Sequence, residues 1–421
     1  MKRTIAILVT LLLCLSLFTA CSDKDAPTTS SGGSTAPSGS GSGSETGESS
    51  GVEVYTVGAL LNVTGWFSSI DSSSSEGLYA MAAIINEDGG IWVDGRNYII
   101  EIDLQDGQSE ATGVRNGAQI LANSGRKYLI VGNCFFIEGS LDIFNSNGIM
   151  TMMNMNSMNF EALNPKWPYS FWFNCGSAQW IVTAIETLRA QYPEVRSIVY
   201  LNDDDGNSGT MTEYIRICAE RSGLEYIDNP ILFDPNLTDF SGIALQTINT
   251  GADATIGNYS DANASAILKE LRNAGSDIVM AMLTNSSIAS YQETAGFDVG
   301  WNFFNFSLVL EEEYCTDMYW RLYQKLNEMY GIEAAKNLSP NSAESLYVWM
   351  QLVQGANSFD VDDVIAYWDT RPALDTITGP GIIGGQEFFG IDRVLSGPIP
   401  VSIGEPNGVS RFAGWVESYV R

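Results

Sequence analysis

The sequence predicts an α/β protein with two lobes, each built on a parallel β-sheet that helices cover on both faces. From Glu53 onward, short apolar runs typical of buried strands alternate with stretches in which apolar residues recur at helical spacing. The number of predicted βα units is larger than a single sheet usually holds. The segment FWFNCGSAQW, at 171–180, indicates the start of a second series and therefore a second lobe.

Apolar runs predict the strands at 54–61, 98–104, 128–132, 149–153, 197–201, 231–233, 254–257 and 277–283. Helices are expected between them, at 73–86, 110–123, 178–191, 209–221, 240–249 and 262–273. In the first helix, Leu78, Met81 and Ile85 share one face, and Gly89-Gly90 ends the pattern. Because ligands bind beyond the carboxyl ends of parallel strands, the turns after these strands are the candidate site.

The pattern changes toward the C-terminus. The stretches 311–330 and 343–357 have the apolar spacing of helices. The segment TGPGIIGGQEFFGIDRVLSGPIPVSIG, at 378–404, is instead typical of short antiparallel strands joined by tight turns.

Composition limits the function classes. The chain has 421 residues, of which 45% are hydrophobic and 17% charged, enough for one large domain or two lobes with real cores. Its net charge is −29. Nucleic-acid-binding proteins need clustered Lys and Arg, so an acidic surface argues against that partner and against adsorption to anionic lipid. The charge suits a protein that stays dispersed by self-repulsion.

The chain contains no histidine, which excludes Ser-His-Asp and Cys-His nucleophiles and every histidine-containing metal site. No C-x-x-C pair occurs among the six cysteines. No metal site and no cofactor is therefore predicted. Buried, unreactive thiols are expected at Cys134, Cys175, Cys218 and Cys315, although their spacing leaves a disulfide open.

The N-terminus has the layout of a secretory signal peptide over residues 1–20: Lys2 and Arg3, an apolar stretch, then small residues. The following LFTAC resembles a bacterial lipobox, which implies lipidation at Cys21; ordinary cleavage near Ala20 is the alternative. Residues 21–52 are then a Gly/Ser-rich tether. We expect an extracytoplasmic protein anchored by lipid to a bacterial membrane, at the cell surface or in the periplasm.

Several long stretches together resemble one known family: 57–91, 99–132, 233–275 and the DTITGPG of 375–381. They are similar to the substrate-binding proteins of ABC importers, specifically the leucine/isoleucine/valine-binding type with a type I periplasmic-binding fold. The resemblance extends over roughly residues 53 to 420. No single motif is specific, but their combined order is.

The resemblance implies two doubly wound lobes joined by a three-strand hinge, with a cleft that closes over one small ligand. The N-terminal lobe would comprise 53–175 and 308–377, and the C-terminal lobe 176–307 and 378–421. In the first cleft turn, Thr64 matches the family's Ser/Thr-Gly motif and Trp66 would stand at the cleft edge. The serines at 72–75 that follow are expected to cap the next helix, with Ser73 and Glu76 at capping-box spacing, rather than to hold a ligand.

The resemblance places the second and third turns after the next two strands. Asn133 and Phe135 occupy positions where the family often has serines, so backbone N–H groups would replace those hydroxyls. Asn156 and Ser157 lie where a ligand-binding threonine is common, although a solvated polar loop is equally consistent with MMNMNSMN.

In the second lobe, Asp205 stands where the family often has a Tyr-Gly pair, and could pair with a ligand ammonium; a solvated turn is the alternative. Tyr259 matches a ligand-contacting tyrosine, and Trp172 completes the expected pocket. Such an aromatic and amide-rich pocket suits a small polar solute. An amino acid is the leading expectation from the family, with an amide or polyol as the rival.

The expected function is capture of this solute and its delivery to an ABC permease complex by a monomer, whose only membrane contact is its N-terminal lipid. The alternative is an extracellular sensor that signals through a partner protein. An enzyme is not expected: without histidine it would need paired carboxylates or a Ser-Lys nucleophile, and the S-x-x-K spacing of Ser124 and Lys127 lies at the end of a strand away from the cleft.

Overall fold

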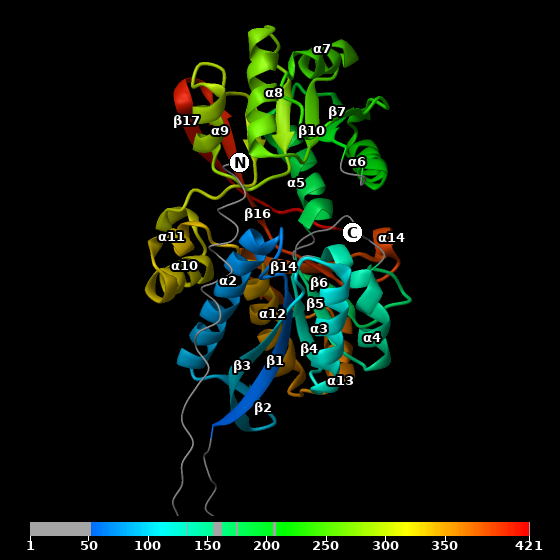
Figure 1. Cartoon of the computed structure of the whole chain (residues 1–421), viewed down its shortest axis with the longest axis vertical. Helices are drawn as coiled ribbons and strands as arrows, with labels where there is room; N and C mark the ends of the chain where they lie inside the picture. The colour runs from blue at the N-terminus through cyan, green and yellow to red at the C-terminus, as the bar shows by residue number, and fades with distance from the viewer. Residues whose placement is uncertain (1–51, 133, 155–161, 174–175, 205–207, 421) are drawn as a thin grey trace, which may run out of the picture. The chain divides into compact units, whose positions relative to one another are not determined.

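The computed structural model describes residues 52–420 except 133, 155–161, 174–175 and 205–207, and Figure 1 shows its course. These residues belong to one compact unit, Gly51–Arg421. The expected signal peptide, Cys21 and almost all of the tether lie outside the described residues. No helix in the described part has the length and apolarity needed to cross a bilayer.

The first sheet is parallel at its centre and antiparallel at its edges. Its described strands run in the order β13 (Leu374–Thr376), β14 (Gly379–Gly384), β15 (Val394–Ser396), β6 (Ser170–Phe173), β5 (Met150–Met153), β4 (Tyr128–Val131), β1 (Glu53–Leu61), β3 (Arg96–Asp106) and β2 (Ile91–Val93). The pairs from β15 to β3 are all parallel, whereas β2, β13 and β14 pair antiparallel.

Helices cover both faces of this sheet because its strands alternate apolar residues between two cores. On one face, Ala59 and Leu61 pack with α2 (Ser68–Glu87), α10 (Asp317–Tyr330), α12 (Asn341–Ala356) and α13 (Val361–Asp369). On the other, Leu60 packs with α3 (Ala111–Asn123) and α4 (Leu141–Ser146). Figure 1 shows α2 and α3 on either side of β1.

The second sheet is also mainly parallel and covered by helices on both faces, but it is antiparallel at one edge only. Its described strands run β17 (Val409–Val416), β16 (Ile399–Glu405), β12 (Phe303–Asn305), β11 (Val279–Met282), β10 (Ala254–Gly257), β7 (Ser197–Asp203) and β8 (Glu225–Tyr226), with β9 (Ile231–Phe233) paired to β7. The helices are α5 (Gly176–Gln191), α6 (Ser208–Ser222), α7 (Ser241–Thr250), α8 (Asp261–Asn273) and α9 (Ile288–Ala295). The first two pack on one face and the last three on the other.

The two sheets confirm the predicted α/β class, with parallel pairing dominant in each. Across the described residues the chain passes between the sheets after β6, after β12, and between β15 and β16. The C-terminal boundary differs from the expected one. Strands β14 and β15 join the first sheet because β15 lies parallel beside β6, so only the part from β16 onward, not all of 378–421, belongs with the second sheet.

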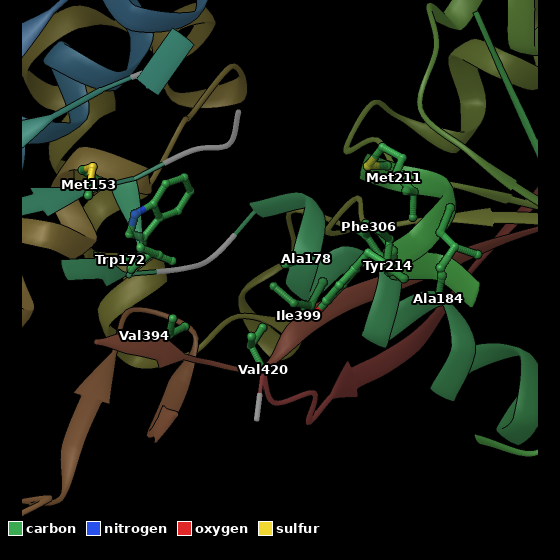
Figure 2. Packing of buried hydrophobic residues seen from close by; sticks show 14 of the residues in the cluster. Met153, Trp172, Ala178, Ala184, Met211, Tyr214, Phe306, Val394, Ile399 and Val420 are labelled. Carbon is green, nitrogen blue, oxygen red and sulfur yellow. The ribbon is translucent and has the colours of Figure 1, made fainter. Parts of the chain in front are cut away.

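One hydrophobic cluster runs along the place where the chain crosses between the sheets. Figure 2 shows Met153, Trp172 and Val394 on the first-sheet side of this cluster, and Met211, Tyr214 and Phe306 on the second-sheet side. Ala178, Ile399 and Val420 lie between them; the first two come soon after crossings in the sequence, and Val420 follows β17. Apolar packing at the crossings therefore links the cores of the two sheets.

Helix α2 begins at Ser68, five residues before the expected start at Ser73. Its N-cap position is Phe67, which makes no side-chain capping bond, so the predicted capping role of Ser73 is wrong. Serine in a helix interior costs only about 0.5 kcal/mol relative to alanine, and contacts with other segments can offset this cost. The serine run therefore forms the first turns of α2.

Candidate functional site

A cavity of about 690 Å³ lies between elements that pack on different sheets. Helix α2 and the segment from α11 (Ile332–Lys336) to the start of α12 form one side, Trp180 on α5 and Asn285 after β11 the other. The described lining residues are Ser69, Ile70, Ser72, Ser73, Glu76, Trp180, Asn285, Glu333, Ala334, Asn337, Leu338, Ser339 and Asn341. We call this the serine-lined cavity.

The polar wall contributed by α2 follows from helical geometry. Ser69, Ser72, Ser73 and Glu76 stand at positions i, i+3, i+4 and i+7, which share one face of a helix. The same spacing is visible in the sequence. Sequence reasoning missed this wall because it began the helix at Ser73, which assigned the earlier serines to a turn.

Hydroxyls of the run also attach α2 to the segment from α11 to α12. Ser74 Oγ and Ser342 Oγ lie 2.6 Å apart and are both buried. Asn154, at the end of β5, donates from Nδ2 to Ser342 Oγ (3.3 Å) and to Ser345 Oγ (3.2 Å). The Ser73 hydroxyl donates to the carbonyl oxygen of Asn337 across 2.5 Å. These bonds hold the α11–α12 segment against the serine face of α2, the helix face formed by Ser69, Ser72, Ser73 and Glu76.

Trp180 forms the aromatic part of the opposite wall. Its ring centroid lies 5.5 Å from that of Phe306. A smaller cavity of about 130 Å³ adjoins it and shares Trp180, Asn285, Leu338 and Asn341 with the serine-lined cavity. The remaining described lining of this smaller cavity includes Tyr319, Lys336 and Thr378. Trp180 and Asn285 thus face both spaces.

Asp71, which the sequence did not single out, lies between the ends of β1 and β4. The backbone N–H of Asn62 donates to its Oδ2 at 2.6 Å, and a Cβ on Gly132 would lie 3.0 Å from its Oδ1. The side chain is 2% exposed, and burial raises the pKa of Asp71 to about 6 despite the Asn62 bond. A lone acid inside a serine run carries no signal of burial, so only the fold reveals it.

Glu344, in the first turn of α12, is a second buried carboxylate. The residue is 1% exposed. Among the described residues, neither carboxylate oxygen has a hydrogen-bond partner at normal distance and angle. Burial raises the pKa of Glu344 to about 7, and the Ile377 backbone opposes this only in part. Helices α2 and α12, which begin beside the serine-lined cavity, thus each carry one buried acid in the first turn.

The predicted cleft turn after β1 is bound to the turn after β3. Thr64 donates from Oγ1 to Asp106 Oδ2 (2.5 Å), and Trp66 Nε1–H donates to the Ser109 carbonyl at 3.1 Å. Gly65, between them, has φ of +87° and is pressed against Ser109. The Trp66 ring is 65% exposed. Neither Thr64 nor Trp66 lines the serine-lined cavity, although the turn leads directly into α2.

Trp172 and Tyr259 are buried. Trp172, on β6, is 1% exposed, and its indole N–H has no hydrogen-bond partner among the described residues. Tyr259 follows β10 and packs edge-to-face on Phe233 with centroids 5.5 Å apart. Burial raises the pKa of its hydroxyl, so it stays protonated and able to donate.

The remaining predicted contacts lie outside what the structure describes. Asn133, Asn156, Ser157 and Asp205 are not among the described residues, and the side chain of Phe135 is likewise not described. Within the described part, no group of three or more Cys, Asp or Glu is placed to hold a metal ion. Cys218 and Cys315 are free thiols, and burial raises the pKa of each to about 11, so both stay protonated.

Comparison with known proteins agrees with this architecture. Solved structures with the same fold include the branched-chain amino acid transporter substrate binding protein LivJ from Streptococcus pneumoniae, in complex with isoleucine. That likeness has a TM-score of 0.62 at 15% identity and covers 87% of this chain and 100% of LivJ. The leucine binding protein LivK from Thermotoga maritima has a TM-score of 0.62 at 15% identity. This likeness covers 86% of this chain and 99% of LivK.

A third solved structure is a leucine-, isoleucine-, valine-, threonine- and alanine-binding protein from Brucella ovis, in a closed conformation. It gives a TM-score of 0.67 at 13% identity, covering 87% of this chain and 95% of that protein. No curated protein sequence matches this chain significantly. The family model described as "Periplasmic binding protein" matches residues 54–394. The chain therefore belongs to the periplasmic binding protein family, whose members bind solutes.

Proposed function

We propose that this protein captures a small polar molecule, an amino acid or a related compound, between its two lobes and delivers it to an ABC importer. The observation that carries the proposal is the serine-lined cavity, because its walls come from elements of both sheets. Its volume of about 690 Å³ falls in the range of about 300–1,000 Å³ typical of small-molecule sites. A ligand that contacts both walls would favour the closed arrangement of the lobes.

We further propose that, in the closed arrangement of the lobes, the ligand contacts also include residues outside the present cavity lining: Thr64, Trp66, Asn133, Phe135, Asn156, Ser157, Trp172, Asp205 and Tyr259. Their support is topological: except for Trp172, which lies on β6, they follow β1, β4, β5, β7 and β10. These are parallel strands, and ligands of α/β sheets bind beyond the carboxyl ends of such strands.

The experiment is thermal unfolding of the purified protein with a library of amino acids, amides and polyols. A bound solute at about one hundred times its Kd should add about 2.7 kcal/mol to the free energy of unfolding. Asn285 is the matched probe because it is exposed, lines the cavity from the second-sheet side and makes no side-chain hydrogen bond within the described part. Asn285→Ala should weaken the response to the solute, whereas Asn229→Ala, in an exposed loop, should leave it unchanged. A library that produces no stabilisation would contradict the proposal.

We also propose that the protein is a lipoprotein anchored through Cys21. A flexible tether of about 30 residues has a root-mean-square reach of roughly 30 Å, enough to hold the lobes clear of the membrane surface. Expression of Cys21→Ser in a bacterial host tests this point. The wild-type protein should fractionate with membranes and the variant with the soluble fraction; equal partitioning of the two would contradict the anchor.

A further inference from the structure

The charges that line the serine-lined cavity are all of one sign. Glu76 and Glu333 are its two charged lining residues in the described part, and neither Lys nor Arg lines it. No hydrogen bond or ion pair joins the Glu76 carboxylate to another described residue. Glu333 is partly neutralised by Lys336, whose Nζ lies 3.2 Å from its Oε1 in an exposed pair. Glu76 is therefore the unneutralised charge of the cavity wall.

Helix N-termini could still favour an anion, because α2 and α12 both begin beside the cavity. Each of these ends, however, already holds a carboxylate in its first turn: Asp71 in α2 and Glu344 in α12. Both side chains are almost fully buried. Neither Asp71 nor Glu344 lines the cavity, so the acid that a ligand carboxylate would meet on this wall is Glu76.

The rest of the lining suits a body that is partly apolar and partly hydroxylated. Trp180, Ile70 and Leu338 provide apolar surface, and an indole face attracts a cation within about 6 Å of its centroid. Serine hydroxyls and asparagine amides supply donors and acceptors that carry no charge. The combination of an unpaired carboxylate, an indole and neutral hydrogen-bonding groups is complementary to an ammonium on a short polar chain.

We infer that the serine-lined cavity takes an organic cation, whose ammonium group pairs with Glu76 while its body lies between Trp180 and the serine face of α2. This inference rests on the proposed function and names the ligand class of that same cavity. The net charge of −29 acts in the same direction, since an acidic protein concentrates cations near its surface. Binding should therefore weaken as salt is added.

A matched set of probes separates the classes: 5-amino-1-pentanol, 1,5-pentanediol and 5-hydroxypentanoate share one chain and differ in charge at one end. L-leucine serves as the zwitterion. Calorimetric titration of the full protein should rank the amine first, the diol second and the carboxylate last. Glu76→Gln should weaken binding of the amine by about tenfold and leave the diol unchanged.

Glu101→Gln is the control, because Glu101 is exposed on β3, lines no described cavity and changes the net charge equally. It should leave the affinity for the amine unchanged. The inference is overturned if the carboxylate or leucine binds more tightly than the amine, if the two variants lose affinity equally, or if none of the four probes binds at millimolar concentration. The proposed function would survive each of these results if a library solute still stabilised the protein, so the two failures are distinguishable.

Discussion

The buried residue Glu344 should make the stability of the fold depend on pH. Its carboxyl group is buried in the first turn of α12 and no charged neighbour contributes to its pKa. Burial penalises the ionised form, which raises the pKa from 4.5 in the unfolded chain to about 7 in the fold. Between these values the folded protein keeps a proton that the unfolded chain loses. The stability from protonated Glu344 is therefore complete below pH 4.5 and is lost as the pH rises to about 7.

Glu344→Gln removes this titration while keeping the size of the side chain. Relative to wild type, the variant should gain about 3 kcal/mol of unfolding free energy between pH 4.5 and pH 8. Urea denaturation of both proteins at the two pH values measures the difference in their unfolding free energies. Contributions from other titrating groups, such as Asp71, cancel in this difference.

Glu101→Gln is the matched control for this measurement, because the Glu101 side chain is exposed. Its stability relative to wild type should stay level across the same range of pH. The account of Glu344 would be contradicted if the difference between Glu344→Gln and wild type were also level.

At the scale of the element, the start of α2 depends on the turn that precedes it. Gly65 has a positive φ, and an added Cβ would lie 2.6 Å from Ser109 Oγ and 2.7 Å from the Gln108 carbonyl oxygen. The β1–α2 turn therefore packs against the β3–α3 turn with no room for a side chain. This close contact positions Trp66 and the first serines of α2.

Gly65→Ala should lower the free energy of unfolding through two effects, backbone strain and overlap with the neighbouring turn. Gly125→Ala separates them, because Gly125 has a similar φ of +73° but open space around it. We expect a loss of about 1–2 kcal/mol for Gly125→Ala, and a loss larger by about 1–3 kcal/mol for Gly65→Ala. Denaturant unfolding measures both, and equal losses would show that the turns are not in close contact.

Individual helices and strands show which parts of the fold can be predicted from sequence and which cannot. Apolar runs predicted β1, β7 and β10 almost to the residue, because buried parallel strands have a simple signature. The predicted start of α2 was five residues too late. Serine disfavours helix only weakly, and the residue before Ser68 is not one that caps a helix with its side chain. Helix α13 and strand β17 were not predicted either.

At the scale of the whole molecule, the sequence predicted two α/β lobes but not where every segment belongs. Antiparallel hairpins can extend either sheet, so the first-sheet position of β14 and β15 could be known only from the fold. The same holds for the candidate site. The serines of α2, Trp180 and Asn285 line one cavity although more than two hundred residues separate the first from the last. Strand-end reasoning points to Thr64 and Tyr259, but it cannot find residues on helix faces.

We propose that the two lobes together hold one small molecule, and native mass spectrometry of the purified protein after incubation with the solute library tests this claim. We expect a complex with a single bound solute, whose mass falls to that of the bare protein when the complex is activated or denatured. Detection of the bare protein alone with every solute would contradict the claim.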